Sequence, residues 1–230
     1  MKTIFENSAF FGVMLSLTSY GIGTILKKRF HIGIFNPLLI SIIISIIVIS
    51  LFHIDYDHYY EGAKYLSYLL TPATVCLAIP LYEQFSLLQK NSMAIIAGIV
   101  AGVFTSLGCI FGMALLFRFS HEEYVTLLPK SITTAIGIGV SEELGGYVSI
   151  TAIVIVVTGV LGNVIAEGIF RLFKITDPIA KGVSLGTASH AIGTSKALEI
   201  GDIEGAMSSL SIVISGLLTV IFASIFAEFI

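Results

Sequence analysis

The chain has 230 residues, of which 56% are hydrophobic and only 12% charged, and its formal net charge is −3. A soluble domain carries about 25% charged residues, so this composition excludes an ordinary water-exposed surface and favours a lipid bilayer as the partner. The sequence has no basic run of the kind that would indicate a nucleic-acid partner.

Five long runs contain no Asp, Glu, Lys, Arg or His. They are residues 7–26, 32–52, 91–117, 144–166 and 205–227. A bilayer crossing needs roughly 20 mostly apolar residues, and each run meets that length. The runs lack the alternating pattern of an outer-membrane barrel, so we predict transmembrane helices.

The N-terminus allows two interpretations. Lys2 followed by an apolar stretch is compatible with a signal peptide, but Glu6 precedes the run, and the run belongs to the repeat described below. We therefore expect a first transmembrane helix. Cys76 and Cys109 both lie in apolar stretches and form no metal-ligand pattern, so we expect small core residues and neither a metal nor a cofactor.

Three further apolar segments differ from the five clean runs. Residues 64–84, 125–141 and 178–198 carry Pro, Gly, Thr, Ser and a few ionisable groups. Such backbone is tolerated at membrane depth only where it packs in protein or lines a wet cavity. The sequence therefore predicts an all-α integral membrane protein with about eight hydrophobic segments, some of them broken or re-entrant helices.

A shared offset predicts an internal duplication within one membrane domain, 1–230. The matched landmarks are Gly21-Ile22-Gly23 with Gly137-Ile138-Gly139, residues 70–74 with residues 186–190, and Glu83 with Glu199. Similarity this weak also arises by chance in Gly- and Ile-rich sequence. The duplication would give one repeat at about 1–118 and another at about 119–230.

The loop charges predict that the two repeats are inverted. Lys and Arg favour short cytoplasmic loops. Lys27, Lys28 and Arg29 fill the first loop of repeat one, whereas the equivalent loop at 141–146 has none. The second loops reverse this bias: residues 53–62 have none, and the equivalent loop holds Arg171, Lys174 and Lys181. The third loops, at Lys90 and at residues 199–204, fit less cleanly. Inversion needs an odd number of crossings per repeat, so one segment in each would be re-entrant or split.

The first broken stretch contains two prolines, Pro72 and Pro80, which interrupt the helical hydrogen bonds. The new helix N-terminus, with Thr71 and Thr74 beside it, would suit a carboxylate. The alternative is a proline kink in which the threonines bond back to their own helix.

The second broken stretch places one cation and three hydroxyls close together at Lys130, Ser131, Thr133 and Thr134. Lys130 either points inward as an anion partner or extends to the membrane interface. Glu142 and Glu143 follow, either as its counter-charge or as loop residues.

The third broken stretch contributes Ser189, His190, Gly193 and Thr194. A histidine within a membrane is a functional candidate, so we expect His190 to face a substrate or proton path, although a structural role stays open. Glu143 and Glu167 are the other candidates for proton coupling. Glu167 also lies within reach of the membrane interface.

Enzyme signatures are missing from the sequence. We find no His-Glu-x-x-His zinc motif, no Cys–His nucleophile pair and no Gly-x-x-x-x-Gly-Lys phosphate loop. We therefore expect neither an enzyme nor an ATP-driven pump.

These stretches resemble the LrgB/CidB antiholin-like family of bacterial membrane proteins. The motifs that carry the resemblance are residues 71–82, 127–135, 141–146, 177–182 and 186–194. The resemblance implies a modulator of autolysis that acts with a small LrgA/CidA-like partner on murein hydrolase activity. It also implies carriage of small carboxylates such as pyruvate, as in the similar domain of the plastidial glycolate/glycerate translocator.

We predict a transporter of small monocarboxylates in the bacterial cytoplasmic membrane, with coupling to protons and with the polar broken segments meeting near the midplane. A dimer is expected by analogy with other inverted-repeat carriers. The alternative is an antiholin-like regulator of murein hydrolase activity that acts by assembly and has no transport of its own.

Overall fold

The structure is a computed structural model that describes residues 10–30 and 36–230, and within these ranges it is helical with no strand. The chain forms two compact units, Met1–Cys76 and Leu77–Ile230, which are called the N-terminal and C-terminal units below. Each unit is described by itself.

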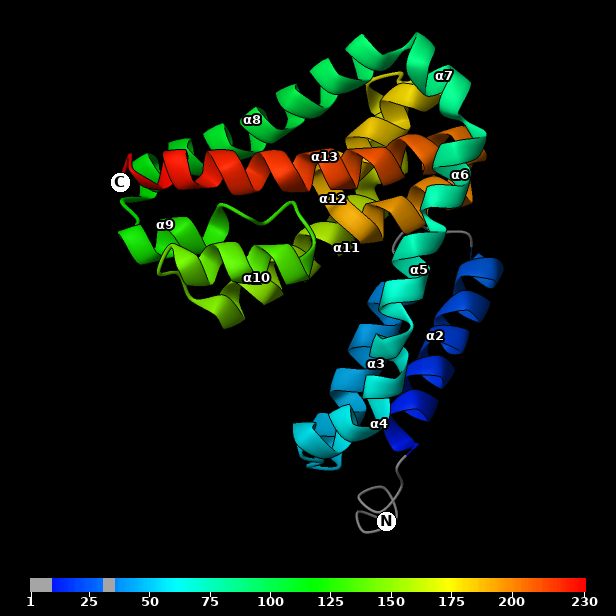
Figure 1. Cartoon of the computed structure of the whole chain (residues 1–230). Helices are drawn as coiled ribbons and strands as arrows, with labels where there is room; N and C mark the ends of the chain where they lie inside the picture. The colour runs from blue at the N-terminus through cyan, green and yellow to red at the C-terminus, as the bar shows by residue number, and fades with distance from the viewer. Residues whose placement is uncertain (1–9, 31–35) are drawn as a thin grey trace. The chain divides into compact units, whose positions relative to one another are not determined.

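The N-terminal unit consists of α2 (Phe11–Phe30), α3 (Pro37–Leu51), α4 (Tyr56–Tyr68) and α5 (Leu70–Cys76) (Figure 1). Asn36 caps α3, because its side-chain oxygen accepts a hydrogen bond from Leu38 N at 2.8 Å. Gly12 packs against the backbone of α4 and Gly23 packs against Pro37. These small residues let the helices approach closely, as is usual in membranes.

Prolines set the breaks in the first polar stretch. α4 ends at Tyr68, and a second interruption separates α5 from α6 (Ala78–Glu83) at Leu77. Each interruption lies three residues before a proline, Pro72 or Pro80, where the ring excludes the normal helical carbonyl contact. The predicted interruption of residues 64–84 is confirmed.

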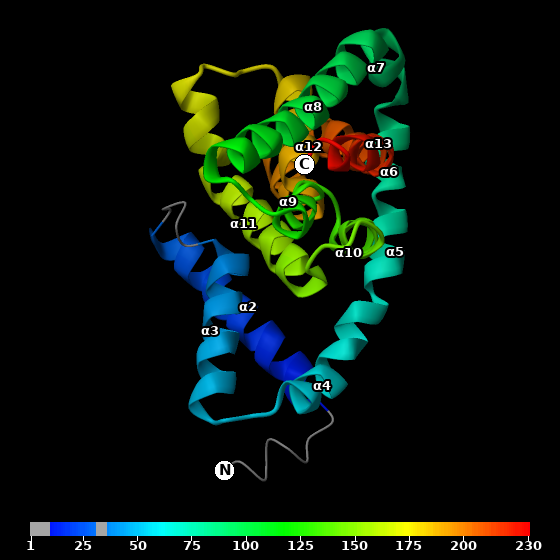
Figure 2. The same cartoon turned by 90° about the vertical axis from the view of Figure 1, so that its left-hand side faces the viewer.

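The C-terminal unit holds the remaining helices. After α6 they are α7 (Phe85–Lys90), α8 (Ser92–Phe117), α9 (His121–Leu127), α10 (Thr134–Glu143), α11 (Val148–Leu172), α12 (Pro178–Ile200) and α13 (Asp202–Ala227) (Figures 1 and 2).

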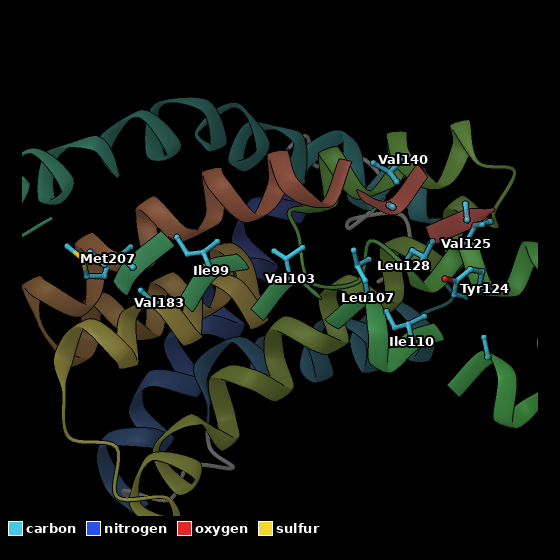
Figure 3. Packing of buried hydrophobic residues seen from close by; sticks show 14 of the residues in the cluster. Ile99, Val103, Leu107, Ile110, Tyr124, Val125, Leu128, Val140, Val183 and Met207 are labelled. Atoms are coloured by element: carbon cyan, nitrogen blue, oxygen red, sulfur yellow. The ribbon is translucent and has the colours of Figure 1, made fainter. Parts of the chain in front are cut away.

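One stripe of α8 forms the centre of the core. Ile95, Ile99, Val103 and Leu107 repeat every four residues and are almost fully buried. The last three are labelled in Figure 3. This spacing places them on one face of a helix. Exposed apolar residues such as Met93 and Leu116 occupy other faces, which is the arrangement expected of a helix that meets lipid.

α8 and α13 run side by side in the same direction. The ring of Phe104 lies 4.6 Å from that of Phe222, and the ring of Phe111 lies 5.6 Å from that of Phe229. The sequence offset is the same in both pairs, so the helices are parallel. Their two ends therefore define two faces of the C-terminal unit, an amino face near Ser92 and a carboxyl face near Phe117.

α12 reverses direction at its centre. Gly182, before the centre, and Leu198, after it, both pack against residues 204–205 at the start of α13. In a straight helix these two residues would lie about 24 Å apart. Ser189 (φ −132°, ψ 15°) and His190 (φ 42°, ψ −137°) have non-helical backbone angles. α12 is therefore a helical hairpin that turns at these two residues.

α9 and α10 form a second hairpin. Thr151 at the start of α11 joins both arms, since its hydroxyl oxygen lies 2.9 Å from Thr126 O and 2.7 Å from Ser141 Oγ. Nearer the turn, Gly137 packs close to the carbonyl of Pro129. The arms are therefore antiparallel, and residues 128–133 form the turn.

The two hairpins enter from opposite faces. The α12 hairpin begins and ends beside the amino end of α13, whereas α9 lies beside its carboxyl end, where Tyr124 Oη donates to Phe226 O at 3.0 Å (Figure 1). Both turns reach the middle of α8: Ser131 Oγ lies 3.1 Å from Ser106 Oγ, and Thr187 packs against Gly102. The C-terminal unit thus contains three long helices, α8, α11 and α13, and two opposed half-length hairpins.

The clean runs form helices over most of their described length, although residues 144–147 are a turn and loop before α11; residues 7–9 and 32–35 lie outside the described ranges. Four helical stretches in the described part are long and apolar enough to cross a membrane: Tyr56–Glu83, Ser92–Phe117, Val148–Leu172 and Asp202–Ala227. An arrangement of eight segments in two inverted repeats is not established and stays a prediction. The compact units divide after Cys76, away from the expected repeat boundary near residue 118.

Candidate functional site

A cavity of about 670 Å³ lies beside the middle of α8. Its walls are α8, the first arm of α12 and the turn of the α9–α10 hairpin. Small residues of α8, including Gly98, Ala101 and Gly102, form one wall. Val183 and Thr187 of α12 pack directly against the two glycines, so these glycines allow the two helices to approach closely beside the cavity.

The polar end of the cavity lies at the hairpin turn. Lys130 Nζ donates to Ser131 Oγ at 2.9 Å, and Ser131 Oγ lies 3.1 Å from Ser106 Oγ of α8. Thr105 and Cys109 line the same region. Lys130 is half-buried, and its ammonium has three donors, so the bond to Ser131 leaves two for a ligand.

The opposite end of the cavity reaches the amino face. Asp177 lines it there and caps α12, because its carboxylate accepts a hydrogen bond from Ala180 N at 2.8 Å. The side chain of Asp177 is exposed. The cavity therefore extends from the exposed carboxylate of Asp177 to the ammonium of Lys130, which lies beside the middle of α8.

The turn of α12 is held by buried hydrogen bonds. His190 Nε2 lies 3.0 Å from the carbonyl oxygen of Ile155 in α11, and Asn163 Nδ2 donates to Ile192 O at 3.0 Å. Thr194 Oγ1 lies 2.7 Å from Ser208 Oγ of α13. A φ of 42° at His190 is rare for a residue with a side chain, so these contacts must offset a strained backbone.

Two glycines of α11 make room for this turn. A Cβ on Gly162 would overlap the hydroxyl of Ser189, and a Cβ on Gly159 would meet the ring of His190. The side chains of both turn residues therefore lie against the α11 backbone, where no larger residue fits.

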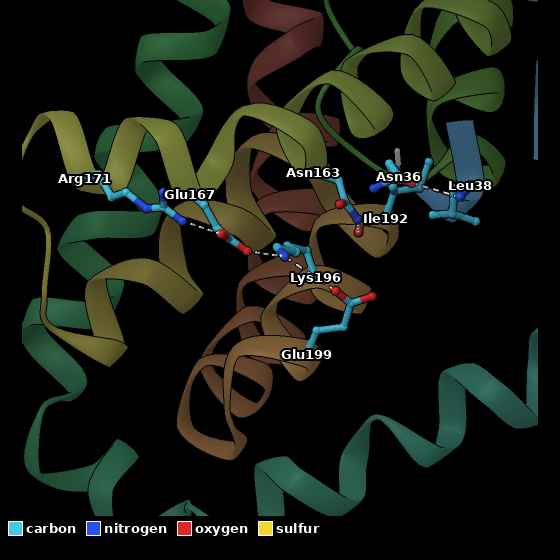
Figure 4. Close-up of polar contacts among 8 residues, drawn as sticks. All are labelled: Asn36, Leu38, Asn163, Glu167, Arg171, Ile192, Lys196 and Glu199. Carbon is cyan, nitrogen blue, oxygen red and sulfur yellow. Dashed lines mark hydrogen bonds and ion pairs between the residues drawn. The ribbon is translucent and has the colours of Figure 1, made fainter. Parts of the chain in front are cut away.

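A line of charges connects α11 to the second arm of α12. Lys196 Nζ lies 2.5 Å from Glu167 Oε1 and 3.5 Å from Glu199 Oε2, and Arg171 bonds to Glu167 at 3.0 Å (Figure 4). The side chain of Lys196 is only 10% exposed, whereas that of Glu167 is 48% exposed. The pair fixes this arm of the hairpin to α11 near the amino face.

The structure divides the expected site residues of the α9–α10 and α12 hairpins into three groups. Lys130 and Ser131 line the cavity. Ser189, His190, Gly193 and Thr194 are buried in the turn of α12 and pack against α11, α13 and the first arm. Thr133 precedes α10 as its N-cap and Thr134 begins the helix; both are partly exposed.

The remaining expected residues lie elsewhere. Thr71, Pro72 and Thr74 are exposed on α5 in the N-terminal unit, and Thr74 Oγ1 donates to Leu70 O at 2.8 Å, as in the alternative of a back-bonded threonine. Glu143 is exposed at the end of α10.

Sequence reasoning missed several polar residues of this unit. Thr105 and Ser106 were included in a clean apolar run, although hydroxyls three and four residues after a Gly-x-x-x-Gly pattern at 98–102 are a signal of close helix packing. Asp177 and Lys196 were not singled out. The buried serines of α13 were missed as well; they are Ser208, Ser209, Ser211 and Ser215.

The expectation that both cysteines are core residues is wrong. Cys76 and Cys109 are both exposed. Cys109 follows Leu107 on α8 but points away from the buried stripe, and it lines the cavity instead.

The fold and cavity define a multi-pass helical membrane protein in which two opposed hairpins meet beside a polar cavity. Comparison with known proteins then gives the family. The model of the LrgB-like family matches residues 16–229. Curated relatives named antiholin-like protein LrgB, from Bacillus cereus and Bacillus anthracis, are 34% identical over 222 residues, which is 96% of this chain and 96% of theirs.

The chain belongs to the LrgB-like family, and the family resemblance seen in its motifs is confirmed. No solved structure matches it.

Proposed function

We propose that this protein is an antiholin-like protein of the bacterial cytoplasmic membrane that modulates murein hydrolase activity and autolysis. This proposal is supported by the 34% sequence identity with proteins named antiholin-like protein LrgB, over 96% of both chains. A small LrgA/CidA-like membrane protein is its expected partner.

Deletion in the native host tests the antiholin proposal. An antiholin restrains lysis, so we expect detergent-induced autolysis to be faster in the deletion strain and to return to the wild-type rate on complementation. Zymograms of the medium would show the corresponding change in murein hydrolase activity. Unchanged autolysis and zymograms in the deletion strain would contradict the proposal.

The cavity favours a second candidate, a carrier of small monocarboxylates. A cation at membrane depth is costly and usually marks a ligand or ion path, and Lys130 projects into a cavity of suitable size for a small solute. The Ser131 hydroxyl lies next to the ammonium, and because Ser131 and Ser106 share one hydrogen bond, one of their two hydroxyl hydrogens remains for a ligand. Opposed half-length elements that meet at mid-depth are also a common design of secondary transporters.

In this carrier, the Lys130 ammonium and its neighbouring hydroxyls bind the carboxylate, and movement of the hairpins opens the site to each face in turn. Proton coupling through His190, Glu143 or Glu167 belongs to the same proposal, as does assembly as a dimer. Both candidate functions are compatible, because altered carboxylate flux can itself change autolysis.

Uptake of labelled pyruvate and glycolate into proteoliposomes tests the carrier, with and without the small partner. Lys130→Met should abolish saturable uptake. Lys181→Met removes a lysine of α12 that lies outside the cavity lining and should leave uptake unchanged. Absence of saturable uptake by the wild-type protein under both conditions would contradict transport.

A further inference from the structure

The cavity has a different chemical character at each end. Lys130 is the only Lys, Arg or His among its lining residues, and it lies at the α9–α10 turn. Asp177 lies at the other end, on the amino face. The lining residues on α8 extend from Ala94 to Cys109, which is about 22 Å along the helix.

The amino face carries most of the basic residues of the C-terminal unit. Lys90 precedes α8, and Arg171, Lys174 and Lys181 lie around the loop between α11 and α12. Arg118 is the basic residue of the loop at the carboxyl face. The excess of Lys and Arg in short loops marks the cytoplasmic side, so the end of the cavity at Asp177 opens toward the cytoplasm.

The α9–α10 turn lies at the other end of the cavity. Leu128 and Ile132, on either side of Lys130, are 1% and 2% exposed, so this turn is firmly packed. Ser131 contacts Ser106 at the middle of α8, so the turn and α8 meet at this end of the cavity.

We propose that Lys130, Ser131 and Ser106 form a site for a small mono-anion that enters from the cytoplasmic end of the cavity. The proposal rests on the carrier function above and specifies its site, its charge selectivity and its open side. One ammonium neutralises one negative charge, and an unpaired second charge would be costly at this depth. Asp177 at the entrance further disfavours a dianion.

Cys109 supplies a natural reporter for this site. It lines the cavity near Lys130, whereas the second cysteine, Cys76, belongs to the N-terminal unit. In a Cys76→Ser variant, Cys109 is therefore the single thiol. A small anionic methanethiosulfonate, MTSES, and its cationic counterpart, MTSET, then report access and local potential without any need for transport.

The experiment compares the labelling rates of Cys109 in inverted and right-side-out vesicles. We expect faster reaction from the cytoplasmic face, with MTSES favoured over MTSET relative to their rates with a free thiol. Lys130→Met should lower this anion preference by about tenfold, because the positive potential at the site is lost. Lys130→Arg should retain it, which shows that the charge and not the fold is responsible. Pyruvate should slow labelling more than the dianion succinate.

Equal labelling from both faces, or an anion preference unaffected by Lys130→Met, would overturn the proposal. The outcomes also separate it from the carrier function. Saturable uptake with a Cys109 rate that is insensitive to Lys130→Met would leave a carrier but refute this site. Anion-selective, pyruvate-protected labelling without uptake would establish the site and refute transport.

Discussion

The two hairpins of the C-terminal unit perform the same reversal by different means. The α9–α10 hairpin turns through a loop, residues 128–133, that exposes an ammonium to the cavity. The α12 hairpin turns at two residues, Ser189 and His190, which are 2% and 3% exposed. A polar turn beside a cavity can bind a ligand, whereas a turn packed against the backbone of another helix holds its hairpin in place.

The packing of the arms shows the same contrast. Gly182 and Gly186 in α12 contact backbone atoms of α13, which cannot move away. Gly137 in α10 mainly contacts the tip of the Ile155 side chain, which can change rotamer. The α12 hairpin should therefore tolerate substitution less well than the α9–α10 hairpin.

Gly186→Ala should have the largest effect. The new methyl group would overlap the carbonyl oxygen of Ser208, and overpacking typically costs about 1–3 kcal/mol, with the upper end expected against backbone. Thermal unfolding of the purified protein in detergent measures the loss. Gly168→Ala in α11, where no atom lies near the added methyl group, is the control; an equal loss in both variants would contradict the account.

His190→Ala should rank second. It removes the buried bond to Ile155 O and keeps the strained φ of 42°, so we expect a loss of about 1–3 kcal/mol in unfolding free energy. His190→Gly also removes the bond but relieves the strain, and it should unfold at a higher temperature than His190→Ala. If His190→Gly unfolded at the lower temperature instead, strain at this backbone angle would not be what determines stability at residue 190.

Gly137→Ala should have a smaller effect, about 1 kcal/mol, because the flexible tip of Ile155 can move aside. The matched comparison is with Gly186→Ala, measured in the same detergent. A loss as large as that of Gly186→Ala would remove the distinction between the hairpins.

Glu167→Gln should have the smallest effect, since this side chain is half exposed and Lys196 keeps Glu199 as a partner. Ion pairs open to solvent contribute about 1 kcal/mol or less. Lys196→Met is the informative counterpart, because it removes the buried member of the pair. A large loss of stability in Glu167→Gln would indicate that this pair, and not the glycine packing, holds the second arm.

The helices and their interruptions could be predicted from the sequence because both signals are local. Runs without charges predicted α8, α11 and α13, and proline predicted the breaks before Pro72 and Pro80. The sequence also predicted that residues 178–198 are interrupted, and the non-helical angles at Ser189 and His190 confirm the break. The exact position of the turn and the return of the second arm were not predictable, because the atoms that Gly182 and Gly186 contact belong to another helix.

The candidate site was predicted in part for the same reason. Lys130 and Ser131 were identifiable as polar groups at membrane depth. Ser106 and Asp177 join them only because α8 and the first arm of α12 are parallel neighbours, which depends on tertiary packing. We expected His190 to face a substrate or proton path, but its Nε2 lies 3.0 Å from the carbonyl oxygen of Ile155.

The inverted repeat stays a prediction that thiol labelling can test. Single cysteines at Lys28 and Lys174 should label from the same face if the swapped loop charges reflect inversion. Labelling from opposite faces would refute it.

In this structure α12 enters the membrane and returns to the same face, opposite the α9–α10 hairpin. Single cysteines at Thr176 and Asp202, which flank α12, and at His121 and Glu143, which flank the other hairpin, test it in a cysteine-free background. With an impermeant maleimide, we expect Thr176 and Asp202 to label in inverted vesicles only, and His121 and Glu143 in right-side-out vesicles only. Labelling of Thr176 and Asp202 from opposite faces would mean that α12 crosses the membrane, and it would contradict the account.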